Sequence, residues 1–209
     1  MSDPPHRLAG GARNLRSIAS LLAASLGLAA ILGLAACGGG PPPATFDLAQ
    51  HQPAAKGLHL RRQLVVAEPT ALQPLDSDHV LVRRPDGTLA TLAHAQWSDR
   101  LPPLVQSRIV QAFENAGAVG RVGPFGGTIS ADVTLDVEIR EFEVDVGAGQ
   151  GKVELAARLV RSASGQIIAA RIFQTSAAGA GEGPSAAASL DQALGQALGD
   201  LTRWAATHL

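Results

Sequence analysis

The sequence predicts an α+β domain: a two-layer sandwich in which an antiparallel β-sheet carries two α-helices on one face, after an N-terminal signal peptide. Three observations predict this. Residues 131–175 alternate apolar and polar side chains along three strand-length segments joined by glycine-containing turns. Residues 99–117 and 185–207 repeat apolar side chains at spacings of three and four. An uncharged apolar run at 17–36 precedes all of them.

The N-terminus has the three parts of a secretory signal. Arg7, Arg13 and Arg16 make the first residues basic, and residues 17–36 carry no charge and are rich in Leu, Ala and Ile. Small residues then precede a break formed by glycines and prolines. This order of basic, apolar and small residues is typical of a signal peptide that is removed after export.

The end of this run resembles a lipobox. In Leu34-Ala35-Ala36-Cys37, the cysteine thiol would receive diacylglycerol, a peptidase would cut before the cysteine, and the new amine would be acylated with a fatty acid such as palmitate. We therefore expect residues 1–36 to be a lipoprotein signal peptide and Cys37 to be the lipidation site. The alternatives are an uncleaved transmembrane anchor, since 20 apolar residues can span a bilayer, and an ordinary buried cysteine.

Residues 37–44 are expected to be a lipidated tether, because three glycines and three prolines follow the cysteine. A polyproline II segment rises about 3.1 Å per residue, so the tether reaches on the order of 20 Å. In enterobacterial lipoproteins an aspartate after the cysteine favours the inner membrane. Gly38 stands there in this chain, which implies the outer membrane facing the periplasm, with inner-membrane anchoring as the alternative.

The remaining residues, 45–209, are expected to form one folded domain. Short strands are predicted at Thr45–Leu48, Gln63–Ala67 and Val80–Arg84. Pro85-Asp86-Gly87 supplies turn residues, so Thr88–Ala95 should fold back as the second strand of a hairpin.

A first helix is predicted next. Asp99 is its expected N-cap, Pro102 and Pro103 suit a first turn that needs no amide donor, and Gly117 should end it. Its apolar face comprises Leu101, Leu104, Val105, Ile109, Ala112 and Phe113. Trp97, just before this helix, is expected to fill the core beneath it rather than to bind a ligand.

Residues 131–146 contain a change of phase. Before Arg140-Glu141 the apolar side chains occupy odd positions, and after it they occupy even ones, namely Phe142, Val144 and Val146. A straight strand would turn one set toward water. A β-bulge at Arg140-Glu141 would keep both sets on one buried face.

Two more strands and a helix complete the domain. Turns at 147–151 and 162–165 should join the segment above to two further strands in an antiparallel meander. After a Gly/Ala loop at 177–184, a helix is predicted over 185–207. Its apolar stripe comprises Leu190, Ala193, Leu194, Ala197, Leu198, Leu201 and Trp204.

The sequence shows no catalytic or metal-binding motif. One cysteine permits no intramolecular disulfide, the net charge of −1 gives no basic field for nucleic acid, and the six histidines lack metal-ligand spacing. Acidic residues alternate with apolar ones along one predicted strand, which favours a solvated sheet face over paired catalytic carboxylates; they are Asp136, Glu138, Glu141, Glu143 and Asp145. We expect no enzymatic activity, cofactor or metal.

Several stretches together resemble the ABC-type transport auxiliary lipoproteins, of the paraquat-inducible protein C type. The most specific is Trp97-Ser-Asp99-Arg-Leu-Pro102. Weaker matches cover about 45–205; they are Phe46-Asp47-Leu48, Leu64 to Pro69, Leu75-Asp76-Ser77, Val80 to Arg83, Leu104-Val-Gln106, Ile139 to Phe142, Phe173, Asp191 to Leu194 and Trp204. Phe46 stands where that family usually has Tyr.

This resemblance implies a partner rather than a substrate. Such lipoproteins serve systems that join an inner-membrane ABC permease complex to a periplasmic MCE-domain protein carrying lipid or other apolar molecules. The chain would then bind the MCE-domain protein while Cys37 holds it on a membrane. Two alternatives remain: an outer-membrane assembly lipoprotein that binds a β-barrel protein, and a periplasmic enzyme or small-ligand binder with a deep polar pocket.

Overall fold

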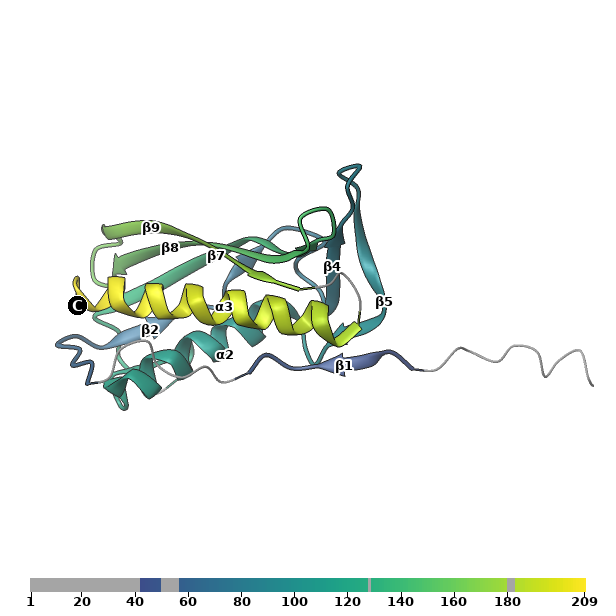
Figure 1. Cartoon of the computed structure of the whole chain (residues 1–209). Helices are drawn as coiled ribbons and strands as arrows, with labels where there is room; N and C mark the ends of the chain where they lie inside the picture. Colours follow the sequence, from purple (N-terminus) through teal and green to yellow (C-terminus); the bar gives the residue numbers. More distant parts are fainter. Residues whose placement is uncertain (1–41, 50–56, 128, 180–182) are drawn as a thin grey trace, which may run out of the picture. The chain divides into compact units, whose positions relative to one another are not determined.

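The computed structural model describes residues 42–49, 57–127, 129–179 and 183–209 of the chain (Figure 1). The predicted signal peptide at 1–36, Cys37 and most of the tether at 37–44 lie outside the described residues. The elements in chain order are β1 (Ala44–Phe46), β2 (Leu64–Val66), β3 (Thr70–Ala71), β4 (His79–Arg83), β5 (Leu89–Trp97), α2 (Leu101–Phe113), the π-helical turn η1 (Glu114–Ala118), β6 (Val122–Pro124), β7 (Val133–Asp145), β8 (Gln150–Arg161), β9 (Ile167–Ala178) and α3 (Gly183–Ala206).

The fold is α+β, but the sheet is mixed, so the prediction of an antiparallel sheet is wrong. The meander β7–β8–β9 and the hairpin β4–β5 are antiparallel as predicted. Along its other edge β7 pairs in parallel with β2, then β3, then β4. β6 extends the sheet in parallel beyond β2, and β1 does so beyond β5. Apolar alternation has the same period in parallel and antiparallel strands, so it cannot tell these pairings apart.

Both α-helices lie on one face of the sheet, as predicted (Figure 1). α2 packs against β2 and β6, while α3 covers β7, β8 and β9. The strands turn alternate residues toward the helices, for example Val133, Leu135 and Leu155, each at most 1% exposed. The described residues place no helix on the opposite face, which we call the open face.

The predicted β-bulge in β7 is confirmed. Ile139 pairs with Leu155 and Glu141 pairs with Glu154, so Arg140 is the additional residue. The bulge keeps Ile139 and the even-numbered residue Phe142 on the same buried side, at 2% and 1% exposure. Val146 was expected in this set, but it is 42% exposed because β7 ends one residue earlier.

The start of α2 differs from the prediction that Asp99 is the N-cap. Arg100 occupies that position and makes no capping bond with its side chain. The Asp99 carboxylate instead accepts a hydrogen bond from the amide of Arg100, at 2.7 Å. A cap is not needed, because the Leu101 amide donates to the Ser77 carbonyl at 3.0 Å and the two prolines that follow have no amide hydrogen.

The end of the first helical region and the buried face of α3 agree with the sequence prediction. Gly117 leaves the helical conformation with a φ of 116°, as expected of a residue that ends a helix. α3 buries its whole predicted stripe. The connection expected at 177–184 is shorter than predicted, since β9 continues to Ala178 and α3 begins at Gly183.

Candidate functional site: the open face of the sheet

The open face is built from alternate residues of β7, β8 and β9. The strand register places Thr134, Val160 and Ile167 in one row across it. A second irregularity makes Ile168 an additional residue in β9, which brings Ile167 and Ile172 to the same side. Both isoleucines are more than half exposed, at 55% and 51%. The first half of β9 therefore presents two exposed apolar side chains on the open face.

A groove of about 510 Å³ crosses one end of this face. One wall is the segment after β6, and the other is the end of β8 with its turn. Its lining residues are Val65, Phe125, Gly126, Ile129, Ala131, Thr134, Asp136, Val160, Arg161, Ser162 and Gly165. Phe125 is 74% exposed at the rim. Burial raises the pKa of Asp136, and Arg158 opposes this shift only in part. The groove lining is thus mostly apolar and includes one carboxylic acid, Asp136, and one arginine, Arg161.

Charged side chains occupy the middle of the open face. Arg140 contacts Glu138 at 3.2 Å and Glu154 at 3.6 Å, and Arg158 reaches Glu138 at 3.7 Å. These groups are partly exposed, so each pair contributes little to stability. They confirm that most of the acidic pattern in β7 belongs to a solvated face.

Glu143 is the exception to the predicted solvated face. It is 3% exposed and forms two bonds to the Arg83 guanidinium, one of them from Nη2 to Oε2 at 3.0 Å. The hydrogen bonding between Arg83 and Glu143, together with the negative charge of Glu143, raises the pKa of Arg83. The pair joins β4 to β7 at a parallel contact that the sequence pattern does not predict.

The segments that carry the family resemblance meet at one junction. The Arg100 guanidinium binds the Asp76 carboxylate, with Nε at 3.0 Å from Oδ1. The Ser98 amide donates to the Phe46 carbonyl at 2.7 Å, so β1 is held there too. Trp97 is 2% exposed and packs edge-on against Phe142, with ring centroids 5.7 Å apart. The junction therefore maintains the fold, and Trp97 is confirmed as a core residue.

The N-terminal segment is fixed to the helices where it joins the domain. Asp47 binds the Arg108 guanidinium of α2 at 2.9 Å, and the Ala49 amide donates to Asp191 of α3 at 2.7 Å. Leu48 between them is 1% exposed. The chain therefore leaves the domain from a defined position beside both helices.

Two further kinds of site were searched for among the described residues: a metal-binding cluster and a membrane-spanning helix. Among the described residues, no three side chains of His, Cys, Asp or Glu gather closely enough to hold a metal ion. Within the same residues, no helix combines the length and apolar character needed to cross a membrane. The sequence analysis did not single out Arg61, Arg62, Arg121 and Arg161, which are exposed at one end of the domain. Two of them, Arg61 and Arg62, adjoin each other before β2, which is a local signal of a basic surface.

Fold and surfaces together define one class of protein: an α+β domain with a helix-covered face, an open sheet face and a firmly attached N-terminal strand. Residues 45–204 match the ABC-type transport auxiliary lipoprotein components. The chain belongs to this family, which confirms the resemblance drawn from the sequence.

The chain is also similar to individual proteins. The chain is 35% identical over 207 residues to uncharacterized protein bll6063 of Bradyrhizobium diazoefficiens, covering 93% of this chain and 52% of that protein. It thus spans about half the length of that relative. The crystal structure of protein XCC0632 from Xanthomonas campestris matches with a TM-score of 0.65 and 27% identity, covering 80% of this chain and 94% of the other. A crystal structure of an uncharacterized protein, 15% identical with a TM-score of 0.60, covers 80% of this chain and 98% of the other and supports the fold alone.

Proposed function

We propose that this chain is an outer-membrane-anchored periplasmic lipoprotein that serves an MCE/ABC-type system moving lipid or another apolar solute between membranes. It acts by binding the periplasmic MCE-domain protein of that system and performs no chemistry. The observation that carries the proposal is the family match over residues 45–204, since it names a transport auxiliary lipoprotein component.

The anchoring part of the proposal rests on the sequence before the domain. Leu34-Ala35-Ala36-Cys37 places a lipid-accepting cysteine a few residues before β1. Several acyl chains on one cysteine give a stable anchor, whereas a single chain binds only marginally. The bond between Asp47 and Arg108 then fixes the segment that follows the tether and β1 to helix α2.

The geometry of the tether supports a partner that comes toward the lipoprotein. Residues 37–44 reach on the order of 20 Å when extended, and the periplasm is much wider. A domain on such a tether stays near its membrane, so the partner has to bridge most of the distance. An MCE-domain assembly rooted in the inner membrane meets that requirement.

The test is photo-crosslinking in intact cells. A photoreactive amino acid is placed at exposed positions of the full-length lipoprotein, for example at Phe125 and Ile172, and at Leu89 near the β4–β5 turn as a comparison. We expect a specific crosslink to an MCE-domain protein, identified by mass spectrometry. Loss of the lipoprotein gene should also alter outer-membrane permeability.

Two outcomes would count against the proposal. Capture of a β-barrel protein without any MCE-domain protein would favour an outer-membrane assembly lipoprotein. Turnover of a small molecule by the purified full-length chain would contradict the absence of chemistry.

A further inference from the structure

Unpaired arginines are concentrated at one end of the domain. In the described part of the chain, Lys152 and six arginines form ion pairs; these arginines are Arg83, Arg100, Arg108, Arg140, Arg158 and Arg203. The described arginines without an ion pair are Arg61, Arg62, Arg84, Arg121, Arg161 and Arg171. Arg171 lies over the Phe173 ring, 5.2 Å from its centroid. Of the remaining five, all except Arg84 lie at the same end.

The strand register brings these four arginines together. Leu64 pairs with both Val122 and Val133, so β2, β6 and β7 all begin at this end. Arg61 and Arg62 precede β2, and Arg121 immediately precedes β6. Arg161 ends β8 opposite Val133. We call the four residues Arg61, Arg62, Arg121 and Arg161 the arginine end; all four are exposed.

The arginine end contains a shallow cavity. It has a volume of about 380 Å³ and is lined by Arg62, Arg161, Ala131, Asp132 and Ala163. The Asp132 carboxylate accepts a hydrogen bond from the Gln63 amide at 2.8 Å. This bond fixes the backbone directly after Arg62. Val119, two residues before Arg121, is 74% exposed and adds an apolar contact beside the charges.

We propose that the arginine end is a docking surface for an acidic surface of the periplasmic protein partner; this inference rests on the proposed function. Acidic carboxylates complement unpaired guanidinium groups, which bind them in a two-pronged geometry. Arginine is also enriched at protein interfaces, where it often carries much of the binding energy. Without residues 1–36, which hold three arginines and one aspartate, the net charge changes from −1 to −3. The arginine end therefore stands out from a mildly acidic molecule and would orient an acidic partner as it approaches.

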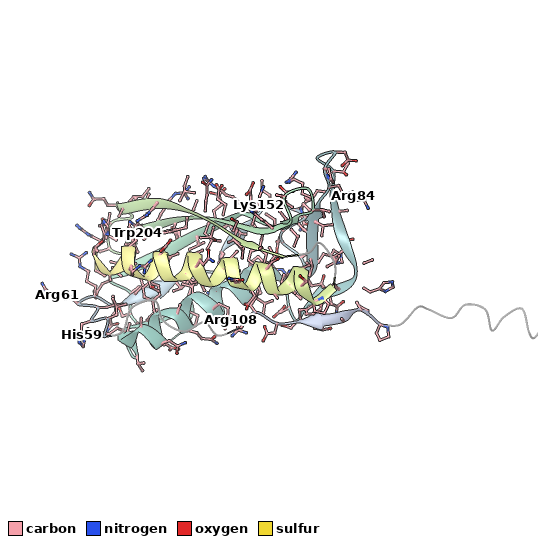
Figure 2. All side chains as sticks on the ribbon, viewed as in Figure 1. His59, Arg61, Arg84, Arg108, Lys152 and Trp204 are labelled. Carbon is pink, nitrogen blue, oxygen red and sulfur yellow. The ribbon has the colours of Figure 1, made fainter. Side chains whose placement is uncertain are left out.

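The position of this end favours a protein over a membrane surface. The chain joins the domain through β1, which pairs with β5, while Arg61 lies at the end where α3 finishes (Figures 1 and 2). β7 runs between the two ends with 13 residues, a length of about 43 Å at about 3.3 Å per residue. The described N-terminal residues therefore enter the domain nearer the opposite end, where Arg84 is (Figure 2), and not at the arginine end.

The experiment compares matched charge reversals in purified full-length lipoprotein in a neutral detergent. Arg62→Glu and Arg161→Glu change the arginine end, and Arg84→Glu makes the same change at an exposed, unpaired arginine of the other end. Arg62→Gln removes the charge without reversing it. The protein probe is a fluorescein-labelled oligoglutamate peptide followed by anisotropy, and the membrane probe is phosphatidylglycerol vesicles.

We expect Arg62→Glu and Arg161→Glu each to weaken peptide binding about fivefold or more and to reduce its dependence on salt, because rim charges act mainly on association. Arg62→Gln should give a smaller loss, and Arg84→Glu should leave affinity within about twofold. All variants should melt at the wild-type temperature, since none of these side chains has an ion-pair partner. Equal peptide binding in all variants would overturn the proposal, as would preferential binding to the vesicles through these arginines.

A second readout separates this inference from the proposed function. The same variants are used in the cellular crosslinking experiment. If wild type captures an MCE-domain protein and Arg62→Glu captures it equally well, the proposed function stands and the arginine end is not its docking surface. If wild type captures no MCE-domain protein, the proposed function fails, whereas the peptide measurement still decides whether this end binds acidic protein.

Discussion

At the scale of single residues, the ion pair between Asp47 and Arg108 links β1 to α2. Arg108 is largely buried, at 10% side-chain exposure, and its Nε has no hydrogen-bond partner in the described structure. Burial raises the pKa of Asp47, but the bonds from Arg108, Leu48 and Ser98 outweigh this, and the pKa lies below its ordinary value. The carboxylate is therefore stabilised in its charged form and compensates a cation that has little access to water.

Asp47→Asn tests this pair. A carboxyl whose pKa is lowered by folding adds stability above its unfolded pKa, about 3.9, and this is lost as the pH falls through the lower folded value. We expect Asp47→Asn to be less stable than wild type at neutral pH, with the difference shrinking below about pH 4. Denaturant unfolding at several pH values measures it. A constant difference down to strongly acidic pH would show that charge is not the cause.

Cys37 carries the second prediction at this scale. Cys37→Ser removes the thiol that would accept the lipid, so we expect unprocessed precursor that still contains residues 1–36. Intact mass of membrane-extracted protein distinguishes the two forms, because the wild type should lose those residues and gain acyl chains. A wild-type protein that keeps residues 1–36 and has no acyl chains would contradict the assignment of Cys37.

At the scale of elements, the β-bulge in β7 makes a strong prediction. Deleting Arg140 removes the additional residue, so the register with β8 can continue only if Phe142 and Val144 turn away from the core. Each loses burial worth about 1.5–3 kcal/mol. We expect a large decrease in the free energy of unfolding, measured by denaturant titration. Arg140→Ala, which keeps the residue count, is the control and should lose only surface ion pairs.

The contact between α3 and the start of β8 depends on Gly151. A methyl group there would lie 2.7 Å from the Ser189 carbonyl carbon and 2.8 Å from the Leu190 amide, both backbone atoms that cannot move aside easily. We expect Gly151→Ala to cost about 1–3 kcal/mol of stability through overpacking. Gly147→Ala is the matched control, because its methyl would have ordinary contacts of 3.4 Å or more. Equal melting temperatures for the two variants would contradict this account.

Elements with a strong local pattern could be predicted from the sequence. The bulge, the β4–β5 hairpin and α3 all follow from side-chain periodicity and turn residues. The cap of α2 could not be predicted in the same way, because the Leu101 amide bonds to Ser77, which only the folded chain brings close. β3 and β6 are two and three residues long, too short to show any period.

At the scale of the whole molecule, the sequence predicts which face of each element is buried, but it does not predict which distant strands pair. The helix-covered face could be predicted because every element shows its own apolar side. The parallel pairing of β2 and β4 with β7 could not be predicted, because nothing in the sequences of β2 and β4 indicates which strand they pair with. The arginine end illustrates the same point: Arg62 and Arg161 are distant in the sequence and meet only because β2 and β8 reach one end.

The dependence of β2, β3 and β4 on β7 has a consequence for export. A chain that crosses a membrane N-terminus first delivers these short strands before β7, the strand they pair with. They cannot close the sheet until it arrives, because two to five residues form no stable strand alone. A peptidase or acyltransferase that acted on Cys37 before β7 had crossed would meet an open chain. We expect a chain truncated after residue 132 to be cut by protease throughout 64–83, where the full-length protein resists.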